Sequence, residues 1–274
     1  MALGRGNTVW LGAMSQTLRC AVSLLALLPA LCAEEPPLAD PVSRGYHLLF
    51  SDEFDGETLD RSKWIDSFPE GRRTNDDDTL QYFAKDGWSL GDGLLRLKAE
   101  KRKLGSKAFT SGMVATFGKF ALTRGWWEAR IKMAPGAGMW PSFQLLPADD
   151  DWPPEIQVAQ SLGRDPRRIY MSLQPKGPGK KEPEADEQAL FKDDWTADFH
   201  TFAIEWKADR INWYVDGVQR HWVTHDIPQK PMYLLLLLNI GGEWAGKPAA
   251  SAFPATMEID YVRVYGASPS PTGK

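Results

Sequence analysis

The middle of the chain contains the stretch Trp152-Pro-Pro-Glu-Ile-Gln-Val-Ala-Gln-Ser-Leu-Gly163, which predicts a strand with polar side chains gathered on one face. Successive side chains of a strand point to opposite faces, so Glu155 and Gln157 share a face. Gln160 lies an odd number of residues further along and joins them only if one extra residue is accommodated as a β-bulge. With such a bulge, Glu155, Gln157 and Gln160 would all point into one groove.

Short runs of alternating apolar and polar residues flank this stretch on both sides. Such alternation indicates half-buried strands, and it recurs at 94–98, 126–132, 202–206, 211–215 and 259–265. Asp216-Gly217 is a strong turn signal that closes 211–215 onto 219–223 as a hairpin. The apolar run 233–239 is too short to cross a bilayer and predicts a strand covered on both faces. The sequence therefore predicts an all-β fold, a two-sheet antiparallel β-sandwich.

Length and composition limit the class of protein. With 274 residues, 43% of them hydrophobic, the chain can bury one large core, and sandwiches of this length are often single domains. A net charge of −4 does not fit a nucleic-acid-binding protein, which normally has a basic face. The 12 Trp residues fit a sugar ligand better, although much of that Trp would serve the core. We expect a monomer that binds a polysaccharide and no nucleic acid.

Residues 1–33 predict a signal peptide. Arg19 precedes the apolar run 21–31, which is short for a membrane-spanning helix but suits the hydrophobic region of an export signal. Translation from Met14 would shorten the long leader, and an uncleaved N-terminal anchor is the alternative interpretation. Both cysteines, Cys20 and Cys32, lie in this segment, so we expect a mature protein without a disulfide. The expected location is secreted or periplasmic, with no transmembrane domain.

The remainder of the chain divides by composition. We expect a proline-rich linker over 34–45, one folded domain over 46–266 and a polar tail over 267–274. Within the domain, residues 176–194 are charged and rich in Gly and Pro, which predicts a surface loop.

Several separated motifs together resemble glycoside hydrolase family 16, the laminarinases and lichenases. They keep the family's order, cover about the whole mature domain, and comprise Phe50–Gly56, Leu59–Trp64, Phe117–Phe120, Gly125–Lys132, Gly138–Phe143, His200–Trp206, Tyr214–Gly217 and Ile259–Tyr265. The resemblance implies a concanavalin-like jelly roll with a concave groove for β-glucans or related polysaccharides. The family's catalytic pattern Glu-x-Asp-x-x-Glu is matched here by Glu-x-Gln-x-x-Gln over 155–160.

The resemblance assigns a role to each position of that pattern. Glu155 matches the nucleophile of a retaining glycosidase, Gln157 replaces the helper Asp, and Gln160 replaces the acid/base Glu. Retaining chemistry needs two carboxyl groups roughly 5–5.5 Å apart, and an amide can neither give nor take a proton at neutral pH. Since acid–base assistance is typically worth about 10²–10⁴-fold, we expect hydrolysis of β-glucan to be weak or absent.

Two alternatives remain beside this hypothesis of a binding protein with impaired hydrolysis. The first is an active retaining endo-β-glucanase, acting on β-1,3 or mixed β-1,3/1,4 linkages, that uses Glu155 with a displaced acid. Asp149, Asp150 and Asp151 are the nearest candidates for that acid in the sequence. The second is a structural or protein-binding sandwich whose groove has no sugar ligand.

Further groove residues follow from the resemblance. Family members often have Trp at the position of Gln144 and His near Gln174, so four expected groove positions carry Gln. Trp127, Trp140 and Trp244 are candidates for stacking on sugar rings, although Trp in a sandwich also fills the core. No cofactor is required, but Glu53 and Asp260 match positions that hold a structural calcium ion in some members.

Overall fold

The computed structural model describes residues 39–75, 78–175, 187–190 and 194–267. These residues belong to one compact unit that spans Pro36–Lys274. The expected signal peptide lies outside the described residues, as do residues 34–38 of the expected linker and 268–274 of the expected tail.

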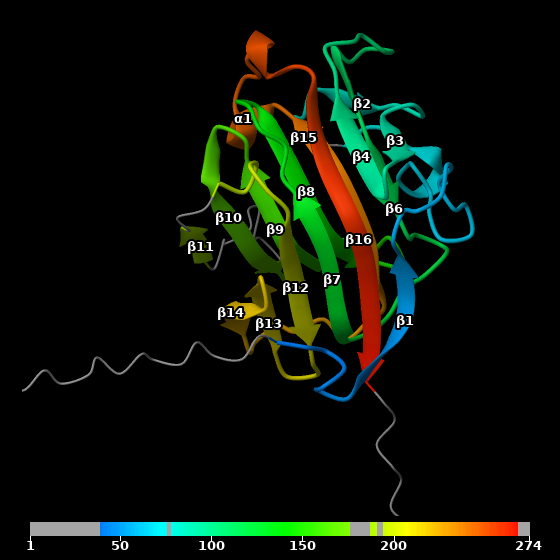
Figure 1. The fold of residues 1–274 in the computed structure, drawn as a ribbon, viewed down its shortest axis with the longest axis vertical. Helices are drawn as coiled ribbons and strands as arrows, with labels where there is room; N and C mark the ends of the chain where they lie inside the picture. Colours follow the sequence, from blue (N-terminus) through cyan, green and yellow to red (C-terminus); the bar gives the residue numbers. More distant parts are fainter. Residues whose placement is uncertain (1–38, 76–77, 176–186, 191–193, 268–274) are drawn as a thin grey trace, which may run out of the picture. The chain divides into compact units, whose positions relative to one another are not determined.

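The larger of two main sheets is antiparallel and lies in front in Figure 1, where the red strand β16 runs beside β7. Among the described residues its strand order is β14-β13-β12-β7-β16-β4-β3, and β1 pairs with the second half of β16. The strands of this sheet are β1 (Tyr46–Asp52), β3 (Trp88–Gly91), β4 (Leu94–Ala99), β7 (Gly125–Lys132), β12 (His200–Trp206), β13 (Ile211–Val215), β14 (Val218–Val223) and β16 (Ala255–Ala267).

The smaller sheet is also antiparallel and has the order β11-β10-β9-β8-β15-β6 in the described part of the chain. Its strands are β6 (Met113–Ala115), β8 (Met139–Pro147), β9 (Glu155–Leu162), β10 (Asp165–Gln174), β11 (Glu187–Leu190) and β15 (Met232–Ile240). A short parallel pair accompanies the two sheets, and the helical turns are brief: β2 (Gln81–Phe83), β5 (Phe109–Ser111), η1 (Pro69–Gly71), α1 (Gly242–Ala245) and η2 (Ala250–Ala252).

Side-chain alternation on both sheets builds the core. In β7, Trp127, Ala129 and Ile131 are fully buried, and from the other sheet Phe143 and Leu145 of β8 enter the same apolar cluster. All nine residues of β15 are buried, as predicted for a strand covered on both faces. The hairpin at Asp216-Gly217 joins β13 to β14, as predicted. The prediction of an all-β two-sheet sandwich is confirmed.

The bulge that is needed to bring Gln160 onto the face of Gln157 is present in β9. Gln160 pairs with Ser142 of β8, but Gln157 pairs with Gln144, so the register shifts by one residue between these pairs. The same shift occurs against β10, where Gln160 pairs with Tyr170 and Gln157 with Ser172. One extra residue in β9 therefore keeps Gln157 and Gln160 on the same face.

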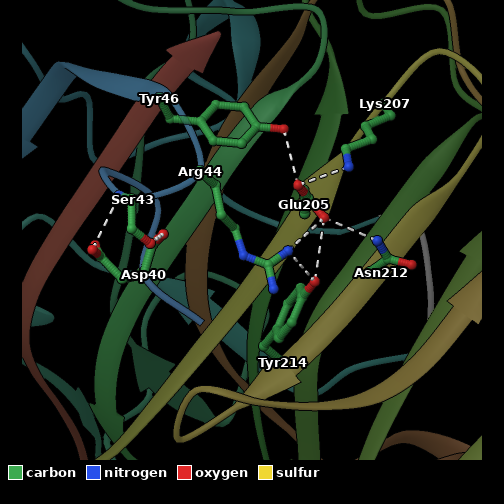
Figure 2. Close-up of polar contacts among 8 residues, drawn as sticks. All are labelled: Asp40, Ser43, Arg44, Tyr46, Glu205, Lys207, Asn212 and Tyr214. Atoms are coloured by element: carbon green, nitrogen blue, oxygen red, sulfur yellow. Dashed lines mark hydrogen bonds and ion pairs between the residues drawn. The ribbon is translucent and has the colours of Figure 1, made fainter. Parts of the chain in front are cut away.

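Residues 39–46 are attached to the outer face of the larger sheet by a buried carboxylate (Figure 2). The Glu205 side chain is only 3% exposed and forms ion pairs with Arg44 at 3.3 Å and Lys207 at 3.0 Å. It also accepts hydrogen bonds from Tyr46, Asn212 and Tyr214. These contacts fix the segment before β1 to β12 and β13, and the backbone N–H of Ala39 adds a hydrogen bond to the Gly217 carbonyl at 2.8 Å.

The prediction of a loop over 176–194 is wrong for part of its length. Residues 187–190 form strand β11, which pairs antiparallel with β10. Residues 176–186 and 191–193 lie outside the described residues, and 194 begins the turn before β12. The loop was predicted from the low apolar content of the segment. Residues 187–190 form a strand nevertheless, because their backbone pairs with the open edge of β10.

Candidate functional site

A groove of about 740 Å³ lies on the face of the smaller sheet that carries Glu155. Strands β8, β9 and β15 supply its floor, while residues 68–75 and the segment 150–152 form its rims. The floor residues used below are Trp140, Gln144, Glu155, Gln157, Tyr233 and Asn239. Alternation explains the set, since these side chains occupy cross-strand positions on one face.

Glu155 lies in this groove and is held through both carboxylate oxygens. The indole N–H of Trp152 donates to Oε2 at 2.9 Å, and the amide of Gln157 donates to Oε1. Gln174 stands directly opposite Glu155 in the pairing of β9 with β10. The carboxylate is therefore positioned by neutral donors from its own strand and from the loop that precedes it.

Hydrogen bonding fixes the direction of the Gln157 amide. An ionised carboxylate only accepts, so Gln157 must turn its NH₂ group toward Glu155. The same NH₂ donates to Gln144 Oε1 at 3.0 Å. Gln157 Oε1 is buried, and no hydrogen-bond donor from the described residues reaches it. Gln157 Oε1 is therefore an acceptor without a partner among the described residues, on a side chain that lines the groove.

The Gln160 amide is oriented in a similar way. The indole N–H of Trp140 only donates, and it binds Gln160 Oε1 at 2.9 Å. The NH₂ group is consequently the donor that Gln160 can offer. Gln160 is 3% exposed and lies beneath Trp140 rather than on the open surface of the groove. Neither amide can transfer a proton at neutral pH, so the described groove has no acid at position 157 or 160.

Trp140 links the groove to an aromatic cluster. Trp244 packs edge-on against Trp140 with ring centroids 5.0 Å apart, and against Tyr170 at 4.8 Å. Trp140 lines the groove itself, whereas Trp244 supports it from α1. Gly242 precedes Trp244 with a φ of 91°, and a Cβ there would come within 2.8 Å of Asp78 Oδ1. The loop around α1 thus depends on glycine to approach residue 78.

Trp127 does not belong to this site, and its prediction as a sugar-binding residue is wrong. The side chain is 0% exposed and lies in the core between the sheets, where Phe120 packs against it with ring centroids 6.0 Å apart. Its neighbour Trp126 is also buried, on the opposite face of β7, beneath Tyr214. The bulky side chains of both residues are used for packing.

The floor and one rim of the groove contain polar residues that the sequence did not point to. Asn239 Oδ1 accepts hydrogen bonds from Gln81 at 2.9 Å and from Asn75 at 3.2 Å, and Asn75 and Asn239 both line the groove. An asparagine ending a run of five leucines is the one local signal for Asn239. Asn75 reaches the groove through tertiary packing, which no local pattern encodes.

The charged residues of the groove are unevenly distributed. Glu70, Asp150 and Glu155 line it together with one cation, Arg72, among its described residues. Asp149 and Asp151 instead form ion pairs with Lys230, at 3.0 and 3.4 Å. Of the three aspartates considered as a displaced acid, only Asp150 lines the groove.

Glu53 and Asp260 are engaged by arginines. Glu53 accepts two hydrogen bonds from Arg263, at 3.0 and 2.7 Å, and Asp260 forms an ion pair with Arg130. A calcium ion would have to displace these cations, so the arrangement does not fit a calcium site. Within the described ranges, no three His, Cys, Asp or Glu side chains are grouped to hold a metal ion. The part of the chain that the structure describes also has no helix long and apolar enough to span a membrane.

Comparison with known proteins gives consistent matches. The family model for glycosyl hydrolases family 16 matches residues 76–263. The chain is 31% identical over 268 residues to the glucan endo-1,3-beta-glucosidase A1 of Niallia circulans, covering 82% of this chain and 39% of that protein. It is 28% identical to a beta-glucanase of Rhodothermus marinus, covering 80% and 85%.

A solved structure agrees with the architecture. The endo-beta-1,3-glucanase from Pyrococcus furiosus superposes with a TM-score of 0.75 at 30% identity, covering 82% of this chain and 96% of that one. The chain spans well under half the length of the first curated relative above, so likeness to that protein concerns one part of it.

Proposed function

This chain belongs to glycosyl hydrolase family 16, and from that membership we propose that it binds a β-linked polysaccharide of the β-glucan class and hydrolyses it weakly or not at all. One observation carries the proposal: the two positions beside Glu155 in the family's catalytic pattern hold amides whose directions are fixed by Glu155 and Trp140. Amides hydrogen-bond to sugar hydroxyl groups without exchanging protons.

The chemistry of glycoside cleavage explains why binding and hydrolysis separate here. In the retaining mechanism a carboxylate attacks the anomeric carbon while an acid protonates the leaving oxygen. Glu155 can supply the carboxylate, but Gln160 cannot supply the proton. An unactivated sugar is a poor leaving group, so loss of the acid falls at the upper end of the typical effect of about 10²–10⁴-fold.

The proposal includes export from the cell. Residues 1–33 have the basic residue, the apolar run and the small residues of an export signal. Polysaccharides of this class are too large to cross a membrane unaided, so a protein that binds them intact meets them outside. Fusing residues 1–45 to a reporter enzyme tests this: we expect reporter activity in the secreted or periplasmic fraction, and purely internal activity would contradict it.

A second candidate function has a specific observation in its favour. Asp150 lines the groove together with Glu155, whereas Asp149 and Asp151 are occupied by Lys230. If Asp150 acts as a displaced acid, the protein is a retaining endo-β-glucanase. Asp150→Asn would then abolish glucan cleavage, while Asp149→Asn, the matched control at the same loop, would not.

Affinity electrophoresis combined with an assay of reducing ends tests the leading proposal. We expect the purified protein to be retarded in gels that contain laminarin or lichenan and to release few reducing ends from either polysaccharide. Cleavage at an ordinary enzymatic rate would overturn the proposal in favour of the second candidate. Absence of retardation in every glucan would favour a structural or protein-binding role.

The double substitution Gln157→Asp, Gln160→Glu tests whether the groove still accommodates the family's substrate. It restores both missing carboxyl groups, so we expect glucan cleavage to rise by at least about 10²-fold. The single variant Gln157→Asp is the control, because it leaves position 160 without a proton donor. Equal inactivity of the double variant would mean that the groove differs in more than these two groups.

A further inference from the structure

Tyr233 is a buried residue whose hydroxyl group has no hydrogen-bond partner in the described part of the chain. It lies in β15, is 1% exposed, and lines the groove. Phe117 packs edge-on against its ring with centroids 5.1 Å apart, and the ring belongs to an apolar cluster with Leu235 and Leu237. No group of the described residues forms a hydrogen bond with Tyr233 Oη. A buried polar atom of this kind needs an explanation, since almost all such atoms are hydrogen-bonded.

The sheet register places Tyr233 near Glu155. Tyr233 pairs with Leu146 across β15 and β8. Leu146 follows Leu145, which pairs with Ile156, so Leu146 stands beside Glu155 on β9. Tyr233 and Glu155 therefore flank one residue of β8 on the same face, with their backbones about 10 Å apart across two strand spacings.

Three charged groups of the groove act on the Tyr233 hydroxyl group. Burial raises the pKa of Tyr233, the Asp150 and Glu155 carboxylates add to this rise, and the Arg72 guanidinium opposes it. The hydroxyl group is therefore protonated at neutral pH and can both donate and accept a hydrogen bond. The groove lining has three carboxylates and one guanidinium within the described residues, so an acidic sugar would be repelled.

We propose that Tyr233 is a specificity-determining residue that hydrogen-bonds to a hydroxyl group of a neutral sugar unit bound beside Glu155. This inference rests on the proposed function, because it requires a polysaccharide in the groove. Gln157 Oε1, a second buried acceptor on this floor without a partner among the described residues, accepts from another hydroxyl group of the ligand. The two atoms together favour a ligand edge that carries hydroxyl groups rather than carboxylates.

The substitution Tyr233→Phe removes only the hydroxyl group. Isothermal titration of the full chain with a β-1,3-linked glucan hexasaccharide should show affinity about threefold to tenfold weaker, as for one neutral hydrogen bond lost. Resistance to urea should not fall, since no bond within the protein is broken. Tyr261→Phe is the matched control. Tyr261 lies in the larger sheet, away from the groove, and its hydroxyl group donates to Glu128 of the same sheet. This substitution should lower the free energy of unfolding and leave glucan affinity unchanged.

The outcomes separate this inference from the proposed function. If the wild-type chain binds the hexasaccharide and Tyr233→Phe binds it equally well, the role of Tyr233 is refuted and the proposed function stands. If the wild-type chain binds no glucan, both fail. Carboxymethylated glucan provides the second readout. It should bind at least tenfold more weakly than neutral glucan. Asp150→Asn removes one of the repelling carboxylates, so it should reduce the ratio between the two affinities. Equal binding of the two polysaccharides would refute the selection for neutral sugars.

Discussion

At the scale of single residues, the exposed fraction of the side chain separates a tryptophan of the groove from a tryptophan of the core. Trp152 is 56% exposed, lines the groove and donates to Glu155, whereas Trp127 is fully buried in the core. Trp152→Ala should weaken glucan affinity about threefold to tenfold and change the free energy of unfolding by less than about 0.5 kcal/mol. Trp127→Ala should cost about 3–5 kcal/mol of that free energy. Titration calorimetry and urea unfolding measure the two effects, and full affinity in Trp152→Ala would contradict its place in the site.

The residues that could be predicted are those whose direction follows from local alternation. Glu155 and Gln157 follow from the alternation of one strand, and Gln160 joins them only with the bulge that the family's pattern requires. Tyr233 and Asn75 do not, because the groove gathers them from strands and loops remote in sequence. The sequence also could not decide which of two adjacent tryptophans faces the core, and in fact both are buried.

At the scale of elements, the bulge in β9 depends on a donor from the other sheet. The carbonyl of Gln157 lies next to the bulge, and the indole N–H of Trp213 in β13 donates to it at 2.8 Å. Trp213→Phe would leave this buried carbonyl without its donor. Trp206 is the matched control, since it is equally buried and its N–H has no partner among the described residues.

We therefore expect Trp213→Phe to lower the free energy of unfolding by about 1–3 kcal/mol more than Trp206→Phe does. It should also weaken glucan affinity, because Gln157 and Gln160 lie on either side of the bulge. Urea unfolding and titration with laminarin measure both quantities. Equal effects of the two substitutions would mean that the bulge holds its shape without Trp213.

Elements with a strong local pattern were predictable, and those stabilised by pairing alone were not. The hairpin at Asp216-Gly217 and the apolar strand β15 have turn chemistry or composition that specifies them. Strand β11 has neither, and it forms where residues 187–190 meet the edge of β10. The bulge was predictable only because the catalytic pattern of the family requires it, since its stabilising partner lies 56 residues away.

At the scale of the whole molecule, alternation is enough to predict two packed sheets, but the strand order depends on global topology. Strand β16 lies between β7 and β4, and β1 continues beside its second half (Figure 1). This arrangement brings residues near both ends of the described chain into one sheet. Stability of the molecule consequently depends on contacts that join distant segments, and the Glu205 cluster is one of them.

The Glu205 cluster predicts how stability depends on pH. Burial opposes ionisation of Glu205, but hydrogen bonds from Lys207 and Asn212 and the charges of Lys207 and Arg44 outweigh it, so its pKa lies below the usual value. The unfolded chain therefore binds a proton at a higher pH than the folded chain does. The stabilising contribution is complete above about pH 5 and is lost as pH falls through the folded-state pKa.

Glu205→Gln should remove the contribution of Glu205 to the pH dependence and lower the free energy of unfolding by about 1–3 kcal/mol at pH 7, since its two cationic partners are partly exposed. Urea unfolding between pH 3 and pH 7 should show a smaller gain of stability with rising pH in the variant than in the wild type. Because Asp66 and Asp216 also have lowered pKa values, the stability of the wild type and of the variant should both still depend on pH. Identical pH profiles would show that the charge of Glu205 does not hold residues 39–46 to the sheet.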